Sequence, residues 1–403
     1  MGAGHGHFVA IGPADVAPAR RPRIAHLTNV YLPVLGGKES YVWNVVEHLP
    51  EFDFEILTAR VPGVPPPTTS PNVRVHRLRP AEWFRGPFAL PMLGQARLLW
   101  GAFSLTRLLR ARELAAGCDV VHSHWSDVEM MDGLRRLVTR SGWQRMLQKT
   151  LTAATFPQPM VYTDHSMLVQ ETPEPVRMLL EHFLRSARLV VAVEPEGTVK
   201  ANEMRDACGG TAKIEYIPNS VDTAVYRPRE EDRRPGTVAY VGRANKAPWL
   251  LQEILRLLPE QRFVLAIAGY SRSMEKWRSM RSERVEVLEN VPPDRLPAVL
   301  TRADVLVNPL LHNAMTRVTI EGLACGLPVV ADEGLSRYPL VDGKTGRLVP
   351  PKPEAFASAV KGLLGNPALL KDYGREGRRI VEREFSNTVI LPRLAAWYRR
   401  LSA

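Results

Sequence analysis

Cysteine is scarce in this chain, with only Cys118, Cys208 and Cys325 among 403 residues. This set is too small for a disulfide framework and too scattered for a four-ligand zinc site, so we expect reduced thiols in a cytoplasmic protein. No apolar run approaches the roughly 20 residues of a membrane-spanning helix. Residues 1–22 are rich in Gly, Ala and Pro and lack the layout of a signal peptide, which predicts a disordered leader.

Several common catalytic signatures are missing as well. The sequence contains no G-x-S-x-G, H-E-x-x-H or C-x-x-C, which argues against the common hydrolase, metalloprotease and thiol-redox classes. It also lacks the GK[ST] of a P-loop and the three-glycine dinucleotide fingerprint.

Lysine supplies only ten of the 53 basic residues, and the net charge is +11. Up to residue 222 there are 24 basic and 22 acidic side chains, and beyond it 29 and 20, so the excess lies in the second half. An anionic ligand in that half and arginine-rich solvated helices explain this asymmetry equally well.

Short apolar or β-branched runs alternate with longer segments of helical period, which predicts parallel sheets with crossover helices. We expect strands at 24–28, 54–58, 73–77, 120–122, 160–163, 189–193 and 214–217, and again at 237–241, 263–268, 285–288, 305–309, 328–331 and 347–349. Helices are expected at 40–49, 98–115 and 176–186. The fold class is therefore α/β, with two Rossmann-like domains facing a cleft at the carboxyl ends of their strands.

The polar, proline-bearing stretch before the second series has the composition of an interdomain linker. The predicted organisation is a leader at 1–22, an N-terminal acceptor domain at 23–220, a linker at 221–236, a donor domain at 237–386 and a final helix at 387–403.

Two glycines, Gly36 and Gly37, follow the first strand and precede a helix, where backbone N–H groups can approach an anion. A plain tight turn explains this pair about as well. Past the strand at 237–241 come Arg243 and Lys246, which suit a phosphate or diphosphate group. Two solvated surface cations are the alternative.

The segment 308–332 (NPLLHNAMTRVTIEGLACGLPVVAD) predicts a helix capped by Thr316 and closed by Gly326. Its N–H groups near Arg317 and Val318 would face the cleft. Glu321 lies one turn into this apolar helix, and a buried carboxylate needs donors such as paired ribose hydroxyls. A carboxylate satisfied within the protein is the other interpretation.

Histidines occur at two strand ends, in H-S-H at 122–124 and in TDHS at 163–166. His122 and His124 could ligate a metal, but no third ligand is evident at metal spacing, so we expect no metal site. His165 is the better candidate for work at a reaction centre, although a buried structural histidine is nearly as good an explanation.

Seven motifs of the chain closely resemble those of the retaining nucleotide-sugar glycosyltransferases of family four. They are GGKES, DVVHSHW, TDHS, IPNSVD, VGR with a nearby Lys, TIEGLACGLPVVAD and DGKTGRLVP. The resemblance runs from about Ile24 to the C-terminus. It implies the GT-B fold, a nucleoside diphosphate sugar (UDP or GDP) as donor, no cofactor or metal, and a last helix that crosses back to the N-terminal domain.

The resemblance also implies a role for each candidate. Arg243, Lys246 and His165 would be catalytic. The donor diphosphate would contact Gly36, Gly37, Arg243, Lys246, Arg317 and Val318, and the ribose Glu321. The sugar would contact Asn313, Ala314, Met315, Thr316 and His165, the base Leu288 and Asn290, and the acceptor Lys38, Glu39, His124 and Trp125.

The chain departs from the family pattern at several positions. Asn313 stands eight residues before Glu321, where the motif has its first Glu, and Thr316 replaces a usual glycine. The spacing of Arg243 and Lys246 is shorter than usual, and a Glu near Tyr338 is missing. These changes suggest an unusual donor sugar or reduced catalysis.

The leading hypothesis is a retaining, metal-independent glycosyltransferase with a small-molecule acceptor, in antibiotic or other specialised-metabolite biosynthesis. A membrane-surface transferase acting on a lipid-linked glycan is the first alternative, because residues 97–112 and 134–151 are basic and apolar. A catalytically silent sugar-nucleotide binder is the second. No nucleic-acid partner is expected.

Overall fold

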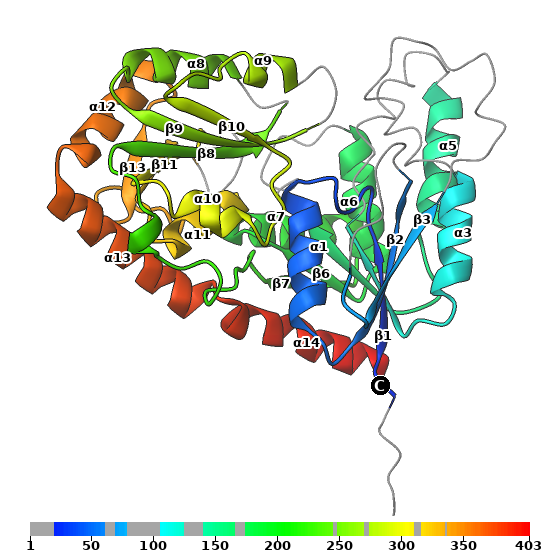
Figure 1. Cartoon of the computed structure of the whole chain (residues 1–403). Helices are drawn as coiled ribbons and strands as arrows, with labels where there is room; N and C mark the ends of the chain where they lie inside the picture. The colour runs from blue at the N-terminus through cyan, green and yellow to red at the C-terminus, as the bar shows by residue number, and fades with distance from the viewer. Residues whose placement is uncertain are drawn as a thin grey trace, which may run out of the picture.

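The computed structural model describes residues 20–60, 69–78, 105–124, 140–165, 174–244, 248–269, 274–309, 316–334 and 337–403. Figure 1 shows two α/β units side by side, with the first half of the chain on the right and most of the second half on the left.

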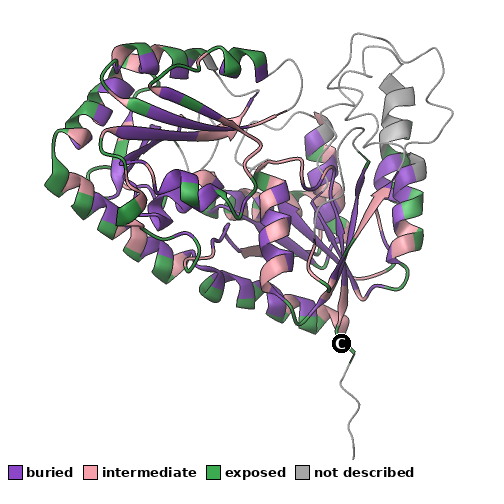
Figure 2. Ribbon diagram, in the orientation of Figure 1, coloured by how far each residue is buried: buried purple, intermediate pink, exposed green. Residues whose placement is uncertain are grey.

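The first unit is built on a seven-stranded parallel sheet of order β3-β2-β1-β4-β5-β6-β7. Its strands are β1 (Arg23–Leu27), β2 (Asp53–Ala59), β3 (Val73–Leu78), β4 (Val120–Ser123), β5 (Met160–Asp164), β6 (Leu189–Ala192) and β7 (Lys213–Tyr216). The inner strands are almost wholly buried (Figure 2), as continuous apolar runs in a parallel sheet require.

The second unit has a six-stranded parallel sheet of order β10-β9-β8-β11-β12-β13. Its strands are β8 (Thr237–Arg243), β9 (Arg262–Ala268), β10 (Val285–Glu289), β11 (Val305–Val307), β12 (Val329–Asp332) and β13 (Gly346–Val349). Both sheets reverse their strand order once, between β1 and β4 and between β8 and β11. These are the switch points at which open α/β sheets bind ligands.

Helices cover both sheets. In the first unit they are α1 (Gly37–His48), α3 (Leu105–Ala115), α5 (Arg140–Ala153), α6 (Glu174–Ser186) and α7 (Pro195–Cys208). In the second unit they are α8 (Pro248–Leu257), α9 (Glu275–Arg278), α10 (Leu296–Leu300), α11 (Arg317–Ala324), α12 (Pro353–Leu364) and α13 (Pro367–Glu384). The expected strands and the GT-B architecture are confirmed.

The last helix, α14 (Asn387–Ser402), returns to the first unit, where it contacts α1 and β4. In Figure 1 it is the red helix that runs beneath the first sheet. Leu391, Leu394 and Tyr398 on this helix are buried in the same cluster as Ile24 of β1. The predicted crossover helix is therefore confirmed, and it begins at Asn387.

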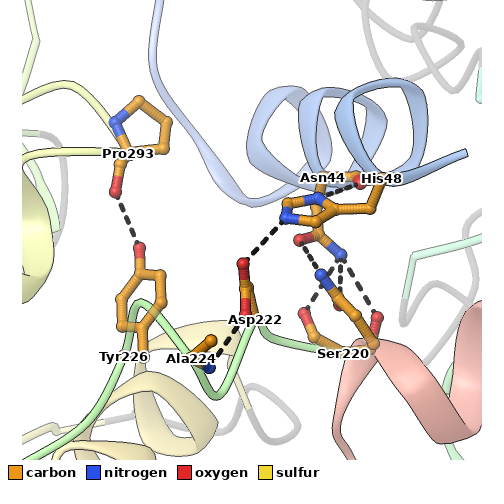
Figure 3. Close-up of polar contacts among 8 residues, drawn as sticks. Asn44, His48, Ser220, Asp222, Ala224, Tyr226 and Pro293 are labelled. Carbon is orange, nitrogen blue, oxygen red and sulfur yellow. Dashed lines mark hydrogen bonds and ion pairs between the residues drawn. The ribbon is translucent and has the colours of Figure 1, made fainter. Parts of the chain in front are cut away.

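Side-chain hydrogen bonds hold the segment between the two units, residues 220–226, which is called the hinge segment below (Figure 3). Asn44 of α1 and Asn387 of α14 exchange two side-chain hydrogen bonds of 2.9 and 3.0 Å, and Asn44 Nδ2 also donates to Ser220. His48 Nε2 lies 3.1 Å from the Asp222 carboxylate. The region expected to be a plain linker is thus tied to α1 through Asp222 and to α14 through Val221, whose carbonyl accepts from the Asn387 N–H at 2.9 Å.

Candidate functional site

A cavity of about 360 Å³ lies between the two units, at the carboxyl ends of both sheets. Its lining comes from the loops after β1, β5 and β6 on one side and from β8, β9, the segments after β10 and β11, and α11 on the other. The volume lies within the range of small-molecule sites in proteins. Nine of the predicted site residues line it: Gly36, Gly37, Lys38, His165, Arg243, Thr316, Arg317, Val318 and Glu321.

The turn before α1 supplies one wall. Gly36 is the N-cap of α1 and has no side chain to interfere with its neighbours. A Cβ atom at Gly36 would lie 1.5 Å from Arg243 Nη2, so any other residue would displace that guanidinium. Gly37 begins the helix, and the positive end of the helix dipole therefore points toward the cavity.

Arg243 ends β8 and reaches across the cleft. Its Nη2 lies 2.8 Å from Oε2 of Glu39, a residue of the first turn of α1. The arginine side chain is 43% exposed, whereas that of Glu39 is 2% exposed. Glu39 was expected on the acceptor side, but the structure pairs it with the predicted diphosphate cation.

Helix α11 begins as predicted, after Thr316, and Gly326 has the expected left-handed backbone with φ of 74°. The Thr316 side chain makes no capping bond to its own helix. Instead, Asn308 Nδ2 donates to Thr316 Oγ1 and to Thr319 Oγ1, at 2.9 Å each. Asn308 thus fixes the entrance of α11. It lies directly after β11, whereas the sequence placed it inside the strand expected at 305–309.

Arg317 and Glu321 form a buried ion pair on α11. Arg317 Nε lies 3.3 Å from Glu321 Oε1, and Arg317 Nη1 donates to the Ser220 carbonyl at 2.8 Å. Burial raises the pKa of Glu321, an effect that the charge of Arg317 opposes. A ribose would not be the sole partner of Glu321, because Arg317 already satisfies one of its oxygens.

The histidines gather into one cluster. His165 lines the cavity, and its Nε2 lies 3.1 Å from Nδ1 of the buried His124. His26 of β1 lies beside His122 and His124, and the three can offer nitrogens within 4.8 Å of one another. The expectation that the H-S-H pair has no third possible ligand is therefore wrong, because β1 brings His26 beside it from far along the chain.

The two predicted base-binding residues do not line the cavity, although their neighbour Val291 does. Leu288 packs against the core of the second unit. The Asn290 side chain is bonded to both the N–H and the carbonyl of Gly269, so it shapes its loop. Lys246, Trp125, Asn313, Ala314 and Met315 lie outside the described residues.

Sequence reasoning did not select several residues that line the cavity: Ser40, Asn219, Tyr226 and Tyr240. Tyr226 is buried and donates to the Pro293 carbonyl at 2.9 Å (Figure 3), which ties the hinge segment to the loop after β10. The only sequence signal for Asn219 was its position inside the IPNSVD motif.

Comparison with known proteins gives consistent matches over most of the chain. Residues 35–225 match the family described as Glycosyltransferase Family 4, and residues 235–366 match that described as Glycosyl transferases group 1. The D-inositol 3-phosphate glycosyltransferase of Pseudarthrobacter chlorophenolicus is 29% identical over 384 residues, covering 84% of each protein.

Solved structures agree on the fold. Sucrose-phosphate synthase from Thermosynechococcus elongatus superposes with a TM-score of 0.72 at 22% identity, covering 94% of this chain and 99% of that one. Anabaena HepE, in complex with UDP and glucose, gives 0.63 at 18% identity, covering 93% and 98%. Across the described residues, no helix is long and apolar enough to cross a membrane.

Proposed function

The chain belongs to glycosyltransferase family 4, whose members use nucleotide-sugar donors. We therefore propose that it moves the sugar of a UDP- or GDP-sugar to a hydroxyl group of a small acceptor, with retention of anomeric configuration. The observation that carries this proposal is one cavity shared by both units. It combines the positive end of α1, the guanidinium of Arg243 and the carboxylate of Glu321.

The proposed chemistry is a front-face substitution. The bond between the anomeric carbon and the diphosphate oxygen breaks, the acceptor oxygen bonds to the same face, and its proton passes to the departing phosphate. The main catalytic contribution is stabilisation of the charge that develops on the diphosphate. We assign that task to Arg243 and Lys246, with the N–H groups at Gly37 and at the start of α11 in support.

No metal is needed in this scheme, because the cations and helix N-termini neutralise the diphosphate. Undiminished turnover in EDTA supports this point, and turnover restored only by a divalent ion contradicts it.

UDP is the first donor nucleotide to test, because the similar fold of HepE holds UDP and glucose. A small polar acceptor is supported by the name of the Pseudarthrobacter relative, an inositol phosphate glycosyltransferase. We propose a specialised metabolite as acceptor because Asn313 replaces the carboxylate expected near the sugar.

A membrane-surface transferase is the second candidate. The described parts of its two motivating stretches weaken it, because Leu108 and Ala111 of α3 and Leu151 of α5 are buried in the core of the first unit. Sedimentation with anionic vesicles tests it: a protein that stays in the supernatant does not bind such surfaces.

The test of the main proposal is a screen of UDP-, GDP- and dTDP-sugars for thermal stabilisation, followed by detection of the released nucleotide. The anomeric configuration of the product, read by NMR coupling constants, tests retention. Stabilisation without any nucleotide release, with or without acceptors, would favour a silent binder instead.

A further inference from the structure

Beneath the cavity, five side chains of the first unit and α14 form a continuous polar chain with His165 inside an otherwise apolar core. His26, His122, His124, Thr163 and Tyr398 are each 0 to 1% exposed. Parallel pairing of β1 and β4 sets His26 opposite His122, and His124 lies two residues further on, on the same face. Tyr398 comes from the crossover helix α14.

The contacts form a single path. His165 Nε2 lies 3.1 Å from His124 Nδ1, and His124 Nε2 lies 2.9 Å from His26 Nδ1. His26 Nε2 lies 3.4 Å from the Tyr398 hydroxyl, which is 2.5 Å from His122 Nδ1. His122 Nε2 ends the path, 2.6 Å from Thr163 Oγ1.

All four imidazoles are neutral at pH 7. Burial lowers the pKa of His26 to about 3, and burial lowers those of His122, His124 and His165 well below their usual value. A neutral imidazole donates through one nitrogen and accepts through the other. The donor–acceptor direction of any one hydrogen bond therefore fixes the tautomer of every ring along the path.

The contacts of Tyr398 select the direction. A phenol is a better donor than acceptor. The hydrogen bond that it donates to an imidazole nitrogen is therefore shorter than the one that it accepts from an imidazole N–H. The hydroxyl lies nearer His122 Nδ1, at 2.5 Å, than His26 Nε2, at 3.4 Å. It therefore donates to His122 and accepts from His26 Nε2–H. His124 Nε2–H then donates to His26, and His165 Nε2–H donates to His124.

We propose that this chain is a positioning device for the transferase site: Tyr398, His26 and His124 hold His165 as its Nε2–H tautomer, so that an unprotonated Nδ1 is available to accept a hydrogen bond from a substrate hydroxyl. The proposal rests on the proposed function, because it names how His165 would serve that site. It also gives α14 a role in the reaction besides packing.

A metal ion is the competing use of this cluster, since His26, His122 and His124 can offer nitrogens within 4.8 Å of one another. The existing contacts favour the hydrogen-bonded chain, because both nitrogens of each of these three rings already have a partner in it. Ligation of one nitrogen would break the chain at that ring.

The decisive experiment is a long-range ¹H–¹⁵N NMR spectrum of histidine-labelled protein at pH 7, assigned with single histidine variants. We expect His26, His122, His124 and His165 all as Nε2–H tautomers. A proton on Nδ1 of His165 would overturn the proposal, as would stoichiometric zinc bound to these rings in the purified protein. The tautomers themselves are read from the wild-type protein, and the variants serve only to assign its ten histidine signals.

Tyr398→Phe gives the functional test, since it removes only the hydroxyl. We expect mixed tautomers at His26, His124 and His165, and about a tenfold fall in kcat with donor KM within twofold. Tyr31→Phe is the matched control, because Tyr31 is buried in the same cluster as Tyr398 but lies outside the chain. Unchanged tautomers and kcat in Tyr398→Phe would refute the positioning role.

The two proposals fail separately. If the expected tautomers are found but no donor is turned over, the proposed function fails while the chain stands. If donor is turned over but His165 carries its proton on Nδ1, the chain fails while the function stands.

Discussion

Arg243 and Glu39 are 204 residues apart in the sequence, yet their side chains form a 2.8 Å ion pair across the cleft between the two units. The arginine is half-exposed to the cavity, whereas the carboxylate is buried. The pair therefore holds the guanidinium over the Gly36 turn, where a donor diphosphate would bind. Such a diphosphate would compete with Glu39 for the same N–H groups.

Arg243→Ala should lose nearly all turnover. Removing one charge-assisted contact to the developing diphosphate costs about 3 kcal/mol, or roughly 100-fold in kcat/KM. Steady-state nucleotide release measures this loss. Arg256→Ala is a suitable control, because Arg256 forms an exposed ion pair on α8, and it should keep wild-type activity. Near-normal turnover of Arg243→Ala would refute its assignment.

Glu39→Gln should tighten the binding of free UDP about fivefold. The amide keeps the size of the side chain but removes the charge that competes with the diphosphate for Arg243. Calorimetric titration with UDP measures the change. Weaker binding would mean that Glu39 positions Arg243 more than it competes for it. Glu253→Gln, which alters the exposed pair on α8, should leave UDP affinity unchanged.

The inner strands β4, β5, β6, β11 and β12 were predictable from the sequence because their residues are buried on both faces of the sheet. Helix α7 was not predicted, since only Gly197 and Ala201 among its residues are buried and the helix has no strong apolar face. Amphipathic period is a weak guide where a helix packs through so few residues.

The site could be predicted where a residue lies at the carboxyl end of a strand or in the loop that leads from a strand to a helix. Arg243 ends β8, Gly36 and Thr316 end such loops before α1 and α11, and all three line the cavity. The partners of these residues could not be predicted, because the docking of two separate units determines them. Glu39 and Asn387 are ordinary helix residues in the sequence, and only the folded chain brings them to the cleft and the hinge.

The reciprocal amide pair at the hinge should contribute measurably to stability. Asn44→Leu leaves the Asn387 amide and the Ser220 carbonyl without their buried partner, which costs about 3 kcal/mol in the free energy of unfolding. Urea denaturation measures the change. Asn202→Leu, which removes a bond within α7 only, should cost about 1 kcal/mol or less.

A double-mutant cycle distinguishes the pair from its surroundings. Asn44→Leu combined with Asn387→Leu should recover at least about 1 kcal/mol of the summed single losses, because two apolar groups leave fewer unsatisfied amides than one. Strict additivity of the two losses would show that the amides do not act as a pair.

Stability should fall between pH 7.5 and pH 5.5. Burial lowers the pKa of His26 to about 3 and lowers those of His122 and His124, so the folded protein keeps these rings neutral while the unfolded chain takes up protons below about pH 6.5. The stabilisation is therefore complete above pH 6.5 and is lost progressively as the pH falls toward 3. At pH 5.5 each ring lowers the free energy of unfolding by up to about 1.4 kcal/mol relative to neutral pH, and the three together lower it by up to about 4 kcal/mol.

Urea denaturation at several pH values measures this slope. The range above pH 5.5 is chosen because carboxylates titrate mainly below it. An independent check is the proton uptake on unfolding at pH 6, which calorimetry in buffers of different ionisation enthalpy reports. Stability that is flat or rises from pH 7.5 to 5.5, with no proton uptake, would mean that these histidines are charged or solvated in the folded protein. A neutral hydrogen-bonded chain behind His165 could not exist in that state.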